Sequence, residues 1–175
     1  MSEFYPPLEE EDEVPNYGKA LIKRYTYNEI HELIRNCAFR MKTTNAFRPD
    51  YILAIGGGGF VPARILRTYL DVPILATSIC FYDDSTNEAM DEPRIIQEVD
   101  PQLIKGKRVL IVDEVDDTGK TLDWLLKHLP KDAEYGIFVV HSKNKLKFAN
   151  LPRDIPYIAC QTTDDIWIEY PWDTQ

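Results

Sequence analysis

The chain has 175 residues, 44% of them hydrophobic, which suits one domain with a full core. Its 29 acidic residues outnumber 20 basic residues and give a formal net charge of −9, which argues against a broad surface for nucleic acid or anionic membranes. The three cysteines lack metal-ligand spacing, and no leader pattern or apolar run of about 20 residues is present, so we expect a cytoplasmic protein with reduced thiols.

The first segment of the chain is dominated by glutamate and proline. Residues 1–18 cannot bury much apolar surface and are predicted to form an acidic mobile arm, which leaves 19–175 for the folded domain. Thr26 and Glu29 then have the spacing of a capping box, and apolar residues follow at helical spacing as far as Met41. The sequence therefore predicts one amphipathic helix at the start of the domain.

Strand and helix patterns alternate through the rest of the chain. This alternation predicts an α/β fold, a parallel twisted sheet flanked by helices, with a ligand crevice at the carboxyl ends of the strands. Residues 81–107 have no apolar period and are predicted to form a long loop. The expected strands are 51–55, 73–80, 108–113, 135–140 and 156–161, and the expected helices are 62–70 and 118–129.

A cluster of carboxylates follows the continuous apolar run at 109–112. Crowded carboxylates at the end of a buried strand are costly unless donors or a cation compensate them, so the cluster indicates a ligand or a metal. The helix that begins at 118–121 offers hydroxyls and free N–H groups that can hold a phosphate. The order of these groups is typical of a sugar-phosphate site. The acidic residues are Asp113, Glu114, Asp116 and Asp117.

Two other interpretations do not account for this segment. A capped helix after an acidic surface turn explains Asp117 or Thr118, but not the carboxylates on the strand. A nucleotide-binding P-loop would end in Gly119-Lys120-Thr121, but its first glycine would have to stand where the chain has Glu114.

A second glycine-rich turn, Gly56-Gly57-Gly58-Gly59, follows the predicted strand at 51–55. The dinucleotide-binding fingerprint Gly-x-Gly-x-x-Gly fails here, because Val61 and Pro62 stand where its last glycine is needed. Consecutive glycines nevertheless allow backbone N–H groups to approach an anion closely.

The acidic segment resembles the phosphoribosyl-diphosphate binding motif of type I phosphoribosyltransferases. The resemblance implies that Asp117 is the catalytic group and that Gly57, Gly58 and Gly59 form the diphosphate loop. Many relatives have Arg or Lys at the position of Gly57, so the cationic contact falls to Arg64, Arg67 or a neighbouring subunit. It also implies that 81–107 is a lid, in which Arg94 could reach the diphosphate. The residues implied to hold the ribose and its phosphate are Asp113, Glu114, Asp117, Thr118, Gly119, Lys120 and Thr121.

Two further segments are similar to 6-oxopurine phosphoribosyltransferases of the hypoxanthine, xanthine and guanine group. Lys143 follows the strand at 135–140, where that group places a lysine that donates to the exocyclic oxygen of the base. The C-terminal segment matches its aromatic tail, which implies a small base-binding hood made with N-terminal residues. In this tail Trp167 would stack on the base, Ile168 would contact the base edge through its backbone, and Asp173 would lie near base and metal.

The resemblance implies an Mg²⁺-dependent enzyme that transfers phosphoribosyl from 5-phospho-α-D-ribose 1-diphosphate to a 6-oxopurine. The metal would be held directly or through water by Asp113, Glu114 and Asp173, and the protein would be a homodimer or homotetramer. The alternative is a non-catalytic regulatory protein that binds phosphoribosyl diphosphate on the same fold. A pyrimidine or adenine enzyme is disfavoured by Lys143 and the tail, while hypoxanthine, guanine and xanthine are not ranked. Trp172 is assigned to the core, and His141, which has no visible partner in the sequence, is expected to be structural.

Overall fold

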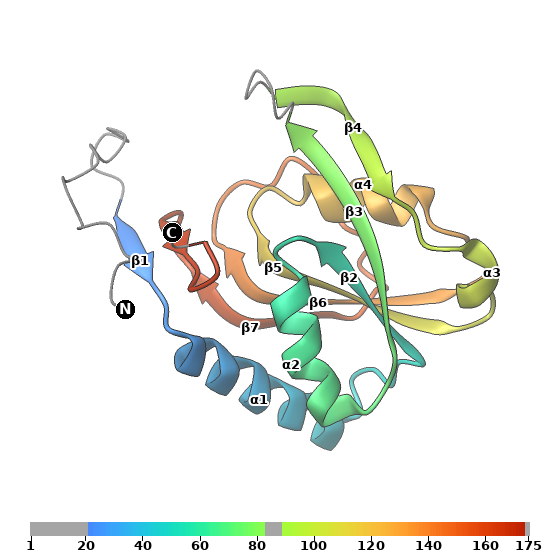
Figure 1. Ribbon diagram of the computed structural model, residues 1–175, viewed down its shortest axis with the longest axis horizontal. Coiled ribbons are helices and arrows are strands. Elements are labelled where there is room, and N and C mark those ends of the chain that lie inside the picture. The colour runs from blue at the N-terminus through green and yellow to red at the C-terminus, as the bar shows by residue number, and fades with distance from the viewer. Residues whose placement is uncertain (1–20, 83–88, 174–175) are drawn as a thin grey trace, which may run out of the picture.

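The computed structural model describes residues 21–82 and 89–173, and the arm predicted over 1–18 lies outside them (Figure 1). Within these ranges no helix is long and apolar enough to cross a membrane. The helices are α1 (Tyr27–Thr44), α2 (Phe60–Leu70), α3 (Pro101–Ile104) and α4 (Lys120–His128). The strands are β1 (Ile22–Arg24), β2 (Tyr51–Gly56), β3 (Ile74–Tyr82), β4 (Ala89–Gln97), β5 (Arg108–Asp116), β6 (Glu134–Lys143), β7 (Tyr157–Thr163) and β8 (Trp167–Glu169).

Six strands form the main sheet in the order β4-β3-β2-β5-β6-β7. All neighbouring strands are parallel except β4, which runs antiparallel to β3 at the edge. Helices α1 and α2 cover one face of the sheet and α4 covers the other (Figure 1). The predicted parallel sheet flanked by helices is therefore confirmed.

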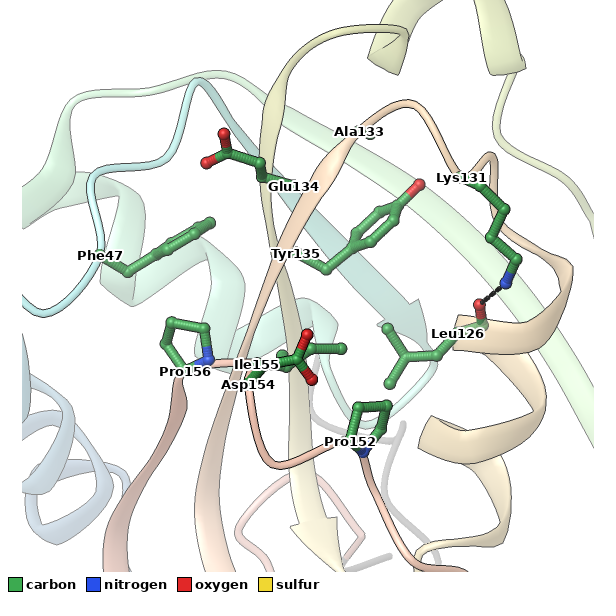
Figure 2. Close-up of a pocket in the computed structure, with 10 residues that line it drawn as sticks. All are labelled: Phe47, Leu126, Lys131, Ala133, Glu134, Tyr135, Pro152, Asp154, Ile155 and Pro156. Carbon is green, nitrogen blue, oxygen red and sulfur yellow. Dashed lines mark hydrogen bonds between the residues drawn. The ribbon is translucent and has the colours of Figure 1, made fainter.

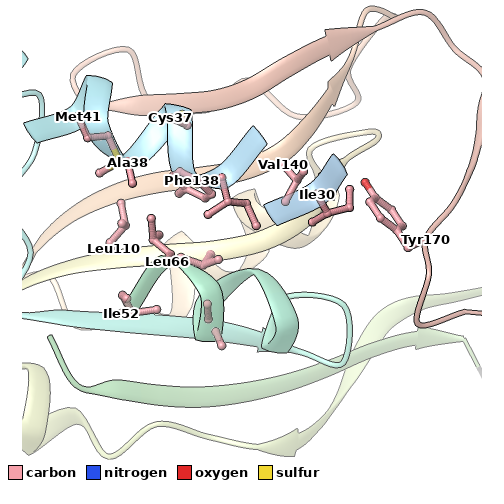
Figure 3. Close-up of a cluster of buried hydrophobic side chains, with 14 of the residues drawn as sticks. Ile30, Cys37, Ala38, Met41, Ile52, Leu66, Leu110, Phe138, Val140 and Tyr170 are labelled. Atoms are coloured by element: carbon pink, nitrogen blue, oxygen red, sulfur yellow. The ribbon is translucent and has the colours of Figure 1, made fainter. Parts of the chain in front are cut away.

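The core explains the continuous apolar run at 109–112. Leu110 and Val112 face the helices α1 and α2, while Val109 and Ile111 face α4, and all four are fully buried. A strand covered on both faces has no position for an exposed polar side chain. Figure 3 shows the first of these layers, to which Ile30, Leu66 and Phe138 belong together with Leu110.

Helix α1 begins at the predicted capping box. The Thr26 hydroxyl accepts a hydrogen bond from the Glu29 N–H at 3.2 Å, and the Glu29 carboxylate accepts one from the Thr26 N–H at 2.8 Å. The helix ends at Thr44, where Asn45 takes the left-handed conformation with φ 53°.

The prediction of a loop over 81–107 was wrong for residues 81–82, 89–97 and 101–104, which form the end of β3, β4 and α3, and residues 83–88 are not described. Strand β4 lies at the edge of the sheet and exposes most of its described side chains, so it needs no apolar period. Helix α3 is a single turn with Pro101 at its start, capped by Asp100, whose carboxylate accepts from the Gln102 N–H at 2.9 Å. Arg94 lies on β4, opposite Cys80 of β3.

A separate two-stranded sheet joins residues far apart in the sequence. Strand β1 pairs in parallel with β8, so that Ile22 lies opposite Trp167 and Arg24 opposite Glu169. The Arg24 guanidinium forms an ion pair with the Glu169 carboxylate at 2.9 Å. This small sheet places the aromatic tail near the carboxyl ends of β5 and β6, because Tyr170, which directly follows β8, contacts both strands.

Candidate active site

Strand β5 extends three residues beyond its predicted end, to Asp116, and carries the carboxylates out of the core. The Asp113 carboxylate accepts a hydrogen bond from the Glu114 N–H at 2.9 Å. Residues 113–122 line a hollow of about 330 Å³ between the end of β5 and the start of α4. The predicted sugar-phosphate residues thus surround one cavity at the carboxyl end of the sheet.

Burial and mutual repulsion shift the protonation of the first two carboxylates. Burial raises the pKa of Asp113 to about 8, and the charge of Glu114 adds to this increase. Burial also raises the pKa of Glu114, with a further contribution from the charge of Asp173, although a hydrogen bond from Trp172 opposes it. Both groups would be stabilised as anions by a cation.

The diphosphate-loop candidates lie against the same carboxylates, because β2 neighbours β5 in the sheet. A Cβ atom on Gly58 would lie 2.0 Å from the carboxyl carbon of Glu114, and one on Gly59 would lie 2.4 Å from the carbonyl oxygen of Val112. A Cβ atom on Gly57 would meet no atom within 4 Å. Close packing against backbone therefore requires a glycine at Gly59, a side chain at Gly58 would have to displace the Glu114 carboxylate, and Gly57 has open space.

The two arginines of α2 that were candidates for the diphosphate contact, Arg64 and Arg67, show no contact with a site among the described residues. The Arg64 guanidinium donates to the Thr68 hydroxyl at 3.0 Å, one turn along the helix. Arg67 is an exposed residue of the last turn. No contact of either side chain to the hollow is seen in the described part of the chain.

The phosphate-loop candidates begin α4. Gly119 precedes the helix with φ 79°, a conformation that favours glycine. Thr118 and Thr121 line the hollow, and Lys120 places its ammonium 5.7 Å from the centre of the Phe81 ring. Helix α4 therefore starts at Lys120, two residues later than predicted, with its first turn directed at the hollow.

Asp117 and Lys143, predicted from segments 26 residues apart to serve one ligand, are in contact. The Lys143 ammonium lies 3.3 Å from Asp117 Oδ1. Lys145 lies 3.0 Å from the same oxygen. Asp165 accepts a hydrogen bond from Lys145 at 2.9 Å and forms an ion pair with Lys143 at 3.7 Å. Partial burial favours the neutral form of Asp117, but the contacts from the two lysines outweigh it and lower its pKa.

The aromatic tail lies beside these residues. Trp167 is 55% exposed on β8, as a ring that is to stack on a planar ligand must be, whereas the neighbouring Ile168 is buried. Asp173 is exposed, and one of its carboxylate oxygens accepts from the Tyr170 N–H at 3.2 Å. Its charge acts on Glu114, which places the tail next to the carboxylates of β5.

Two expectations for the tail need correction or extension. Trp172 packs partly against the core as expected, but its indole N–H also donates to the Glu114 carboxylate at 2.8 Å. His141 is fully buried and does have a partner, since its Nδ1 lies 2.8 Å from the Tyr170 hydroxyl, which itself donates to the Glu114 carbonyl at 3.1 Å. The hydrogen bonds from Trp172 and Tyr170 to Glu114 connect the tail to β5. Burial lowers the pKa of His141 to about 4.

Several residues of the site were missed from the sequence. They are Lys145, which contacts Asp117, Lys147, which contacts Asp116, Asp165, which pairs with Lys143 and Lys145, and Tyr157, which donates to Asp116. A signal was present for the two lysines, because Lys145 and Lys147 alternate with Leu146 and Phe148 after β6, as in an extended segment with one polar face. Asp165 and Tyr157 come from distant segments and have no such signal.

A larger cavity, of about 600 Å³, lies at the opposite end of β6 and β7 (Figure 2). Phe47 and Tyr135 form its aromatic part, and Lys131 donates to the carbonyl of Leu126 at 2.8 Å. This ammonium therefore satisfies the end of α4 and is not directed at a ligand. The polar groups that could bind a phosphorylated sugar lie at the other end of the sheet.

The carboxylates of β5 fit a hard divalent cation, because burial and repulsion between carboxylates raise their pKa values and a bound cation would offset both effects. Within the described residues, no group of three or more metal-ligating side chains converges on one point. Such a site suits Mg²⁺, which keeps several waters and takes other ligands from a bound phosphate compound. Asp113 and Glu114 are the side chains that would hold it, with Asp173 nearby.

A parallel sheet, a pair of carboxylates and a helix start around one hollow define a protein that binds phosphorylated sugars at the carboxyl ends of its strands. Residues 26–175 match the family model of the phosphoribosyl transferase domain. The chain belongs to the phosphoribosyltransferase family.

Individual relatives and structures agree with this assignment. The chain is 38% identical to a hypoxanthine-guanine phosphoribosyltransferase of Schizosaccharomyces pombe, over 86% of this chain and 88% of that protein. It is similar to a hypothetical protein from Neisseria gonorrhoeae solved with bound ppGpp, with a TM-score of 0.79, 39% identity and coverage of 89% and 90% of the two chains. A purine phosphoribosyltransferase from Pyrococcus horikoshii has a TM-score of 0.67 and 28% identity, with coverage of 88% and 95%.

Proposed function

We propose that the protein transfers phosphoribosyl from 5-phospho-α-D-ribose 1-diphosphate to a 6-oxopurine, giving the nucleoside monophosphate and diphosphate. The observation that carries the proposal is the 3.3 Å contact between Lys143 and Asp117. It puts a cation suited to an exocyclic oxygen beside the last carboxylate of the sugar-phosphate motif. An adenine amino group would present a donor to the Lys143 ammonium, so adenine should be refused.

The reaction breaks the bond between ribose C1 and the diphosphate oxygen and forms a bond from C1 to a purine nitrogen. Thr118, Gly119, Lys120 and Thr121 would hold the 5-phosphate, and Gly57, Gly58 and Gly59 the diphosphate. Asp117 would accept the proton that leaves the purine imidazole ring, and its lowered pKa keeps it in the ionised form that can do so. Asp113 and Glu114 would hold the ribose hydroxyls.

The base would be held between the hood and β6. Trp167 would stack on its face, the backbone at Ile168 would contact its edge, and Lys143 would donate to its oxygen. Mg²⁺, when bound at Asp113, Glu114 and Asp173, would neutralise the charge of the departing diphosphate. The proposal includes a cytoplasmic location and a homodimer or homotetramer, the latter measurable by light scattering of the purified protein.

The test is product formation with Mg²⁺, the diphosphate donor and each nucleobase in turn. Hypoxanthine, guanine or xanthine should yield a nucleotide, and adenine and uracil should not. Lys143→Met should raise KM for the purine about 10- to 100-fold, because a charge-assisted hydrogen bond to the base is lost. The control is Lys105→Met, which removes an exposed lysine paired with Asp132 away from the site. Product from adenine or uracil alone would overturn the base assignment, and binding of the donor without any product would favour the regulatory alternative.

The ppGpp bound to the Neisseria protein supports a second ligand for the same site. This nucleotide carries guanine, ribose and a 5-diphosphate, the same chemical groups that Lys143, Trp167 and residues 118–121 would contact. We propose that it competes with phosphoribosyl diphosphate. Steady-state inhibition should be competitive with the donor, and inhibition that the donor does not relieve would contradict the proposal.

A further inference from the structure

The segment after β6 runs alongside the turn that begins α4. Its side chains alternate, with Lys145 and Lys147 half-buried toward the turn, and Leu146 and Phe148 exposed at 92% and 81%. The two lysines therefore face the residues of the sugar-phosphate motif, although they lie about 30 residues beyond it in the sequence.

The Lys147 ammonium contacts three acceptors of a single dipeptide. It donates to the carbonyl of Asp116 at 2.6 Å and to the carbonyl of Asp117 at 3.0 Å, and it lies 3.1 Å from Asp116 Oδ2. An ammonium has three hydrogens and no acceptor, so these contacts use its full capacity. Lys147 is thus committed to the protein and is not left to bind a phosphate directly.

The next two residues continue the same contact. The Phe148 N–H donates to the carbonyl of Thr118 at 2.9 Å, and the Ala149 carbonyl lies 3.4 Å from the position of a Cβ on Gly119. Lys147 and Phe148 therefore hold three successive carbonyls of the turn, those of Asp116, Asp117 and Thr118.

Holding these carbonyls fixes the direction of the N–H groups. In a trans peptide the carbonyl of one residue and the N–H of the next point in opposite directions, and the peptide bonds of this turn are trans. The N–H groups of Asp117, Thr118 and Gly119 are consequently directed away from Lys147, and they make no hydrogen bond to the described residues. Free N–H groups that share one direction form an anion site.

We propose that Lys147 is a positioning residue for phosphoribosyl transfer, which anchors the carbonyls of the turn so that its N–H groups face the 5-phosphate. The inference rests on the proposed function, since the 5-phosphate is the anion for which the turn is prepared. It also sets the backbone of Asp117, so Lys147 supports both the phosphate contact and the carboxylate next to the base.

A simpler structural role has to be separated from this one. Asp116 is buried, its carboxylate also accepts from Tyr157 at 2.7 Å, and loss of Lys147 would leave that carboxylate without its cation. Removal of one partner of a buried ion pair is strongly destabilising. The double variant Asp116→Asn with Lys147→Met removes both charges and so restores neutrality, but it does not restore the donor to the two carbonyls.

The experiment measures the Kd of phosphoribosyl diphosphate by calorimetry with Mg²⁺, the KM of both substrates and the melting temperature. Lys147→Met and the double variant should both raise the Kd of the donor about 10- to 100-fold, while the purine KM changes little. The double variant should melt at a higher temperature than Lys147→Met. Leu146→Ala, which changes an exposed neighbour on the same segment, should match the wild type.

The outcomes separate the two proposals. If the double variant binds the donor as tightly as the wild type, Lys147 is only a countercharge to Asp116 and the inference is overturned. Normal donor binding by Lys147→Met would also overturn it. If the wild type binds the donor but forms no nucleotide with any base, the proposed function fails, and the Kd values still decide the role of Lys147. If Lys147→Met does not fold, the double variant alone provides the comparison.

Discussion

The sugar-phosphate half and the base half of the site are built in different ways. The first half is almost continuous in sequence, because one strand end and one helix start, residues 113–122, line its hollow. The second half combines β1, the end of β6, Asp165 and the tail after β8, which lie more than 140 residues apart at the extremes. A continuous motif fixes its own geometry, whereas the base half depends on contacts between distant segments, and these can be lost separately.

The largest effect is expected at the point where the halves meet. Asp117→Asn should lower turnover at least about 100-fold with little change in substrate binding, because the amide cannot accept the purine proton. Single-turnover and steady-state kinetics would measure it. Asp165→Asn, which removes the other carboxylate paired with Lys143 and Lys145, should cost much less. Near-normal turnover of Asp117→Asn would remove Asp117 from the role of the base.

The buried contact between β6 and the tail should make the base half sensitive to acid. The pKa of His141 is lowered from 6.5 to about 4 by burial, so the folded protein binds this proton less readily than the unfolded chain. The lowered pKa contributes about 3 kcal/mol to the free energy of unfolding above pH 6.5, and this contribution is lost as the pH falls toward 4. Urea unfolding from pH 7 to 4 should show this loss in the wild type and a shallower loss in His141→Asn. Parallel curves would contradict the assignment.

The contact between the glycine loop and β5 offers a matched pair of variants. Gly58→Ala would force a Cβ to 2.0 Å from the Glu114 carboxyl carbon and displace it, so kcat/KM should fall about 10- to 100-fold. Gly57→Ala adds its Cβ to open space and should remain close to the wild type. Equal effects of the two substitutions would show that loop flexibility, and not the contact with Glu114, matters.

The same contrast explains what could be predicted from the sequence. The apolar run at 109–112 and the capping box of α1 depend on neighbours in the chain, and both predictions are confirmed. Strand β4 was missed because an edge strand with exposed side chains carries no apolar period. Resemblance singled out Lys143 and the tail, but the sequence does not indicate that Tyr157 or Trp172 donates to a carboxylate of β5, since these contacts span 41 and 58 residues along the chain. It also does not indicate that Asp165 pairs with Lys143 and Lys145.

The pairing of β1 with β8 has a consequence for synthesis on the ribosome. Strand β1 emerges first and has to wait for residues 167–169, more than 140 positions later, before it gains its hydrogen-bonded neighbour. During that interval the growing polypeptide can already complete β5 and α4, so the pocket for the phosphorylated pentose precedes the platform for the heterocycle. A product truncated shortly before residue 167 would keep the residues that hold the 5-phosphate of the donor, but it would lack Trp167 for the base and Asp173 for the metal, and it should form no nucleotide.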